Sequence, residues 1–185
     1  DDALSLHGDP ERGPCEVGIH IADVTHYVRP GSALDHDARE RGCSVYLADQ
    51  ALPMLPDALS GGLCSLTDGV DRLTVSVVAT LTPEGDLTGA RIVEGVIRSA
   101  ASLSYEDAAA LLRERSGVMA VALHGLDRLA RALKKRRLEQ GGLELDLPEV
   151  RPVLDAAGEP IAFRERRQLA THSLIEEFML LANQI

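Results

Sequence analysis

The chain begins with two adjacent aspartates, Asp1 and Asp2, which are candidates for binding a divalent cation. Carboxylate oxygens are hard ligands, and Mg²⁺ takes few of them, because water and substrate phosphate complete its coordination shell. Adjacent side chains on an extended segment point to opposite faces, so such a pair alone seldom chelates one ion. Taken alone, the pair is more simply interpreted as solvated charge, and further residues must decide.

A second group of chemically capable residues consists of His20, Asp23 and Tyr46. His20 and Asp23 are three positions apart in an expected strand, which places them on opposite faces and disfavours a shared metal ion. We therefore favour a hydrogen-bonded core histidine for His20. Tyr46 could stack on a nucleic-acid base, because every base offers a π-face. It could equally be a core aromatic, and the residues alone favour the core.

Two charge features bear on nucleic-acid binding. The net charge is −10, whereas phosphate binding usually requires a basic surface. A nuclease that holds divalent cations needs clustered carboxylates, however, and its basic surface could lie on other domains. The basic run 134–137 falls in the last turns of an expected helix, which favours a solvated helix end over an RNA track. His172 is expected to have a core or capping role.

Length and composition indicate one domain with a sizeable core. Of the 185 residues, 45% are hydrophobic and 26% are charged, an ordinary soluble composition. The apolar runs are too short to span a bilayer, and the start does not resemble a signal peptide. Cys15, Cys43 and Cys64 form no CxxC pair, so no zinc knuckle is expected. Their odd number, without a secretory signal, favours reduced thiols in a cytoplasmic setting. The acidic start without Met indicates a fragment or an excised domain.

The hydrophobic pattern predicts an α+β fold with a mixed, largely antiparallel sheet and surrounding helices. Residues 42–70 are expected to form a long, ordered but irregular segment whose apolar residues need burial. The expected strands are 17–23, 72–82, 89–99 and 161–164, with edge pieces within 143–154. The expected helices are 32–41, 105–115, 123–139 and 168–185.

Several longer motifs follow one another along nearly the whole chain. The first are DDALS at 1–5, VGIHIADVTHYV at 17–28, SVYL at 44–47, LPMLP at 52–56, LSGGLCSL at 59–66 and GVDRL at 69–73. The later ones are GVIRS at 95–99, LSYED at 103–107, GLELD at 142–146 and LIEEFMLLAN at 174–183. In this order they resemble the RNB catalytic domain of the RNase II/RNase R exoribonucleases. Residues 1–185 are then expected to be part of a single RNB-type domain.

The resemblance implies a processive 3′→5′ exoribonuclease that releases nucleoside 5′-monophosphates from the 3′ end of single-stranded RNA by two-metal catalysis. Asp1 and Asp2 match the last two of the family's four metal-binding aspartates, with Mg²⁺ as the expected ion and Mn²⁺ as an alternative. Tyr46 matches the tyrosine that clamps the terminal nucleotides. Glu176 matches the glutamate near the 3′-terminal nucleotide. The opposing aromatic of some members falls near Leu145, so an aromatic sandwich is not implied.

Other parts of the family's machinery lie outside this sequence. The first two aspartates and the catalytic arginine of the second half of the domain are absent, so the isolated chain is expected to be inactive. Flanking OB-fold domains that bind RNA are expected in the parent protein. Two alternatives stay open, a catalytically inactive RNA-binding or regulatory homologue of the same fold and, less favoured, an acidic protein-interaction module.

Overall fold

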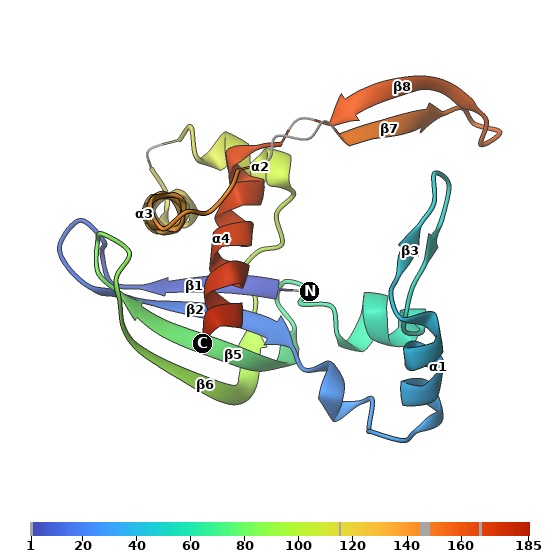
Figure 1. Ribbon diagram of the computed structural model, residues 1–185, viewed down its shortest axis with the longest axis horizontal. Helices are drawn as coiled ribbons and strands as arrows, with labels where there is room; N and C mark the ends of the chain where they lie inside the picture. Colours follow the sequence, from blue (N-terminus) through green and yellow to red (C-terminus); the bar gives the residue numbers. More distant parts are fainter. Residues whose placement is uncertain (1, 115, 145–148, 167) are drawn as a thin grey trace. The chain divides into compact units, whose positions relative to one another are not determined.

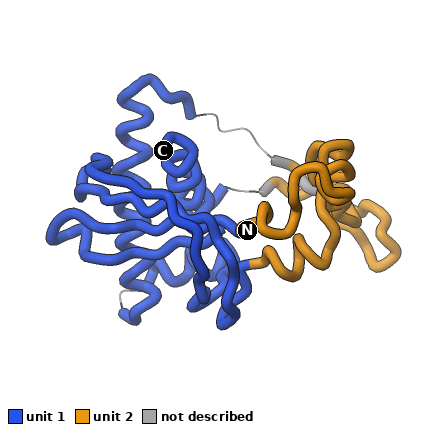
Figure 2. The backbone as a smooth tube through the Cα atoms, turned by 90° about the horizontal axis from the view of Figure 1, so that it is seen from below, with its two compact units in different colours: residues 1–22, 66–144, 168–185 blue, residues 23–65, 145–167 orange. Residues whose placement is uncertain are grey.

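A computed structural model describes residues 2–114, 116–144, 149–166 and 168–185. Contacts divide the chain into two compact units (Figure 2). Unit 1 consists of residues 1–22, 66–144 and 168–185, and unit 2 consists of residues 23–65 and 145–167. The chain thus leaves unit 1 twice and returns to it twice, so each unit is assembled from segments that are distant in sequence.

Unit 1 is built on a four-stranded antiparallel sheet with the strand order β1-β2-β5-β6. Its strands are β1 (Asp2–His7), β2 (Cys15–Ala22), β5 (Asp71–Leu81) and β6 (Leu87–Arg98). The alternating pattern predicted β2, β5 and β6 to within two residues at each end. It did not predict β1, which is six residues long and forms an edge of the sheet.

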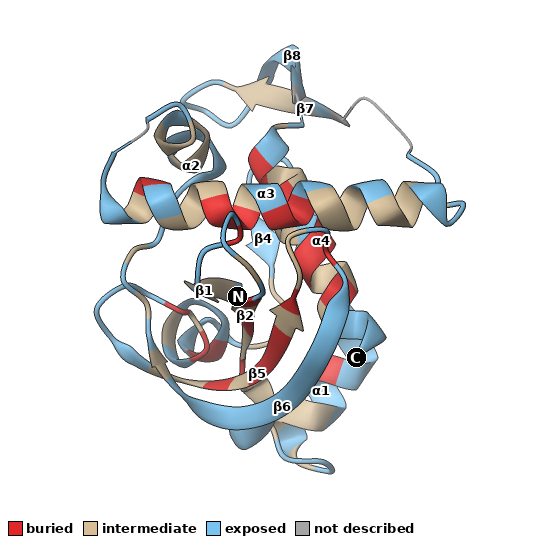
Figure 3. Cartoon of the chain, turned by 90° about the vertical axis from the view of Figure 1, so that its left-hand side faces the viewer, coloured by how far each residue is buried: buried red, intermediate tan, exposed pale blue. Residues whose placement is uncertain are grey.

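Two helices cover one face of this sheet. The helices of unit 1 are α2 (Tyr105–Leu111), α3 (Val118–Glu139) and α4 (Ala170–Gln184). Figure 1 shows α4 running across the strands, and Figure 3 shows buried stretches on β5 and along α3 while β6 is exposed. The core joins alternate residues of β2 and β5 to the apolar faces of α3 and α4. Its larger members are Val17, Ile19, Val77, Leu81, Leu126, Leu129, Leu174, Phe178 and Leu181.

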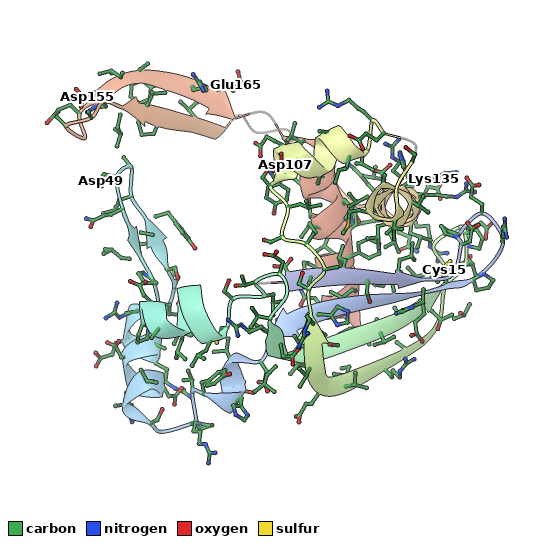
Figure 4. All side chains as sticks on the ribbon, turned by 180° about the vertical axis from the view of Figure 1, so that it is seen from behind. Cys15, Asp49, Asp107, Lys135, Asp155 and Glu165 are labelled. Carbon is green, nitrogen blue, oxygen red and sulfur yellow. The ribbon has the colours of Figure 1, made fainter. Side chains whose placement is uncertain are left out.

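The described residues of unit 2 form one α-helix, two short helical turns and two small hairpins. The helical elements are α1 (Ala33–Arg41), η1 (Val24–His26) and η2 (Ala58–Leu63). One hairpin pairs β3 (Val45–Tyr46) with β4 (Ala51–Leu52), and the other pairs β7 (Glu149–Leu154) with β8 (Pro160–Arg166). Figure 4 shows Asp49 and Asp155 at the tips of these two hairpins.

The predicted start of α1 is confirmed. The Oγ of Ser32 accepts a hydrogen bond from the Asp35 amide at 3.2 Å, as an N-cap residue does. Gly42 ends the helix with a φ of +71°, a left-handed conformation that glycine adopts without a steric penalty.

The α+β prediction is confirmed, and all named strands pair antiparallel, with parallel pairing at the isolated bridge between Asp68 and Ser99. The prediction that the apolar residues of 42–70 are buried is wrong for six of the large ones. Leu59 and Leu66 are buried, but the exposed residues are Val45, Tyr46, Leu47, Leu52, Leu63 and Val70. For those in the β3–β4 hairpin, the reason is that β3 and β4 have only two residues each, too few to build a buried layer.

Among the described residues, no helix combines the length and the apolar character needed to span a membrane.

Candidate functional site

Asp2 is the first residue of β1, where it pairs with Ile21 of β2. Leu4 and Leu6 follow at intervals of two and pack against the core, so strand alternation places Asp2 on the face of the sheet that carries the helices. Asp2 is exposed and forms no ion pair or side-chain hydrogen bond with the described residues. Asp1, the other predicted metal ligand, lies outside the described residues.

Two adjacent glutamates on α4 have different environments. Glu177 is only 3% exposed, and Nη2 of Arg137 on α3 donates to its Oε1 at 2.5 Å. This hydrogen bond, the largest influence, raises the pKa of Arg137. Glu176 is exposed, because one residue turns the helix by more than a quarter of a revolution. Glu177 therefore joins α3 to α4, while the carboxylate of Glu176 is accessible to a ligand.

The basic run at the end of α3 is fully engaged in ion pairs. These pairs are Lys134–Glu144, Lys135–Glu139, Arg136–Asp86 and Arg137–Glu177. The Asp86 pair ties α3 to the turn between β5 and β6, and the Glu177 pair ties it to α4. The prediction of a solvated helix end is wrong for Arg136 and Arg137, because these two residues make tertiary ion pairs.

Tyr46 lies on the β3–β4 hairpin of unit 2, opposite Ala51. The turn of this hairpin is closed by the Leu47 amide, which donates to the Gln50 carbonyl at 2.8 Å. The Tyr46 side chain is 80% exposed, so the core interpretation favoured by the residues alone is wrong. An exposed ring offers its π-face to a base. Leu145, the position of the opposing aromatic in some family members, lies outside the described residues.

His20 and Asp23 do not form a pair. The Oδ1 of Asp23 accepts hydrogen bonds from the Thr25 hydroxyl at 2.7 Å and from the His26 amide at 3.1 Å, so Asp23 caps η1. His20 is hydrogen-bonded to two serines instead, which confirms its predicted structural role. Burial, and to a smaller extent His7, lowers the pKa of His20.

A ring stack between α2 and α4 was not expected from the sequence. The rings of Tyr105 and His172 have centroids 3.9 Å apart and planes inclined by 16°. Nδ1 of His172 accepts from the Leu169 amide at 3.1 Å, which confirms the predicted capping role. His172 lies four residues before Glu176 on α4, so the stack and this carboxylate share one helix face. Tyr105 and His172 are far apart in sequence, and no local pattern links them.

The described residues do not form a metal site by themselves. They contain no group of three or more His, Cys, Asp or Glu side chains placed to hold one ion. The carboxylate of Asp2 is a hard oxygen ligand of the kind that Mg²⁺ and Mn²⁺ prefer. The chemistry of this donor fits such an ion, which would need further ligands to be held.

Residues 1–185 match the family model of the RNB domain. The chain belongs to the RNB domain family. It is 44% identical over 188 residues to the Homo sapiens protein "Exosome complex exonuclease RRP44", a match that covers 99% of this chain and 19% of that protein. The resemblance indicated by the motifs is thereby confirmed.

Solved structures agree with this membership. The RNB-family chain matches "Mycoplasma genitalium RNase R in complex with ribose methylated single-stranded RNA" with a TM-score of 0.91 and 27% identity, covering 98% of this chain and 29% of that chain. Yeast Ssd1, described as a pseudonuclease, shares the fold with a TM-score of 0.75 at 24% identity, covering 99% of this chain and 22% of that one. The chain spans less than a third of the length of each of these relatives.

Proposed function

We propose that this chain is part of the catalytic domain of a 3′→5′ exoribonuclease, which hydrolyses single-stranded RNA to nucleoside 5′-monophosphates. The observation that carries the proposal is the RNB match over the whole chain, with exposed carboxylates at the two described positions that the family resemblance selects, Asp2 and Glu176. Relatives that are named as an exonuclease and as an RNase R bound to RNA support it.

Asp1 and Asp2 are proposed to supply two of the carboxylates that hold divalent ions, Mg²⁺ or Mn²⁺. When bound, such ions activate a water molecule and stabilise the leaving 3′-oxygen. The described neighbours of Asp2 include no cation paired with it, so its charge is available to a metal ion. The other two aspartates of the family's site, and its arginine, are proposed to lie in other parts of the full-length protein.

Tyr46 is proposed to clamp the terminal nucleotides by stacking, and Glu176 to contact the 3′-terminal nucleotide. Stacking tolerates every base, which suits degradation without sequence preference. A carboxylate accepts hydrogen bonds from ribose hydroxyls, the groups that distinguish RNA from DNA. Because the chain itself carries a net charge of −10, flanking OB-fold domains are proposed to provide basic RNA-binding surface. A cytoplasmic location is part of the same proposal.

The substitution Asp2→Asn in the full-length protein tests the metal assignment. We expect hydrolysis of a 5′-labelled single-stranded RNA to be abolished, while RNA binding is largely kept. A matched control is Glu84→Gln, an exposed carboxylate in the β5–β6 turn, at the end of the sheet opposite to Asp2. Retained turnover in Asp2→Asn contradicts the assignment. Wild-type protein that binds RNA without hydrolysing it favours the inactive-homologue alternative.

Residues 1–185 alone are expected to be inactive, because two of the family's four aspartates and its arginine are not among them. The check is incubation of the isolated chain with labelled RNA and Mg²⁺. Measurable Mg²⁺-dependent degradation would show that this chain carries a complete site.

A further inference from the structure

His20 is the centre of a polar network that joins three strands of unit 1. Its Nε2 is 2.9 Å from the Oγ of Ser5 on β1, and its Nδ1 is 2.8 Å from the Oγ of Ser76 on β5. Ser76 also lies 3.1 Å from the Oγ1 of Thr74, and both of these hydroxyl residues are buried. Buried polar groups require such partners, so the network is specific to the arrangement that satisfies all of its members.

Glycine at position 18 makes room for the bond between His20 and Ser5. In the observed pairing, Gly18 lies directly opposite Ser5. A Cβ at position 18 would be 2.4 Å from the Ser5 Oγ and 2.6 Å from the His20 Nε2. No side chain larger than hydrogen fits there unless the hydrogen bond is broken.

The network lies on the face of the sheet opposite to Asp2. His20 is opposite Ala3 in the register, whereas Asp2 is opposite Ile21. Successive residues of a strand point to opposite faces, so the side chains of His20 and Asp2 lie on different faces of the sheet. The histidine therefore does not reach the carboxylate of Asp2 across the sheet. Any influence on that carboxylate passes through the backbone of β1.

The alternation of apolar residues in β1 does not by itself define its register. Leu4 and Leu6 require that even-numbered residues face the core, and a shift of β1 by two residues keeps this alternation, although Leu6 would then leave its place against Gly125 of α3. Such a shift would place Ser5 opposite His20 or Glu16 in place of Gly18. With Ser5 opposite Glu16, the serine would lie too far from His20 to form the bond, and with Ser5 opposite His20 the present diagonal bond would be replaced by a different geometry. Since β1 is an edge strand, only β2 holds it laterally within the sheet.

We propose that His20 is a positioning residue that acts through Ser5 to hold β1 in the register that presents Asp2, the first residue of this strand, to a divalent ion. This inference rests on the proposed function. His20 would contact neither metal nor RNA; it would determine where the carboxylate of Asp2 is held.

The two serines allow a matched experiment, because each makes one hydrogen bond to His20 and only Ser5 belongs to β1. In the full-length protein, Mn²⁺ affinity is measured by calorimetric titration for Ser5→Ala and Ser76→Ala, with melting temperature measured alongside. We expect both variants to melt at lower temperatures, and Ser76→Ala the lower of the two, because Ser76 is buried and also bonded to Thr74. We expect Ser5→Ala to weaken Mn²⁺ binding about tenfold, as loss of a supporting residue around a metal site commonly does, and Ser76→Ala to leave it nearly unchanged.

Kinetics provide a second measurement. Ser5→Ala should lower kcat for RNA hydrolysis without changing KM, and Ser5→Thr, which restores the hydroxyl, should recover both kcat and Mn²⁺ affinity. Equal Mn²⁺ affinities for the two alanine variants would overturn the inference, and so would a failure of Ser5→Thr to recover. Asp2→Asn separates the two proposals. If it leaves Mn²⁺ binding intact, the metal assignment fails; if it abolishes binding while Ser5→Ala does not weaken it, only the positioning role fails.

Discussion

The sheet and helices of unit 1 differ from the hairpins of unit 2 in how far they bury large side chains. The chain has two phenylalanines, of which Phe178 on α4 is 0% exposed and Phe163 on β8 is 76% exposed. Tyr46 on β3 is similarly exposed. An isolated two-stranded hairpin buries little and is marginally stable. Unit 1 is therefore held by its own core, whereas the hairpins keep aromatic surface available for binding.

The largest expected effect is the difference in unfolding free energy between alanine substitutions at the two phenylalanines. Phe178→Ala should lower the free energy of unfolding by about 3–5 kcal/mol, because it removes a fully buried ring. Phe163→Ala should change it by about 0.5 kcal/mol or less, as exposed positions usually do. Urea denaturation followed by circular dichroism measures both. Similar losses for the two variants would mean that the β7–β8 hairpin contributes to a core.

The adjacent glutamates of α4 differ in the same way, because Glu177 is buried and Glu176 is exposed. Glu177→Gln should destabilise the protein by about 3 kcal/mol, because it leaves Arg137 without its charged partner in a largely buried site. Glu176→Gln should leave stability nearly unchanged and lower RNA hydrolysis. Denaturation curves and turnover of labelled RNA test the pair. A reversed pattern would assign the site to Glu177.

A smaller effect on unit 1 is expected from pH. Burial lowers the pKa of His20 below its ordinary value of 6.5. As the pH falls below that value, the unfolded state takes up a proton that the folded state does not, so the protein loses stability. Above that value His20 is neutral in both states, so its protonation does not affect stability. The difference in unfolding free energy between wild type and His20→Gln should therefore vary with pH below 6.5. A difference that does not vary with pH contradicts this sign.

At Tyr46, as at Phe163, only a small effect on stability is expected. Tyr46→Ala should change the free energy of unfolding by about 0.5 kcal/mol or less, because the ring is exposed. It should instead change the length of the final RNA product, since the clamp on the terminal nucleotides is lost. Tyr46→Phe retains the ring and should retain the wild-type product. High-resolution gels of labelled RNA compare the three proteins, and an unchanged product in Tyr46→Ala counts against a clamp.

The sequence by itself determined the long elements and the family. The apolar pattern of β5, the turn that predicts β6 as its returning strand, and the apolar patterns of α3 and α4 are clear because these elements span many residues, although α3 begins five residues before its predicted start. The meaning of Asp1 and Asp2 came from the motifs downstream and not from the acidic pair itself. Short elements with few apolar residues, such as β1 and the β3–β4 hairpin, carry too little pattern to be predicted.

Only the tertiary structure decided which side chains are free. Glu176 and Glu177 are equivalent in sequence until Arg137, from another helix, engages one of them. The exposure of Tyr46 and the pairing of Tyr105 with His172 likewise depend on which segments become neighbours. The physical reason is that periodicity reports which face of an element is apolar, whereas the partner of a polar or aromatic side chain is set by contacts between residues that are distant in sequence.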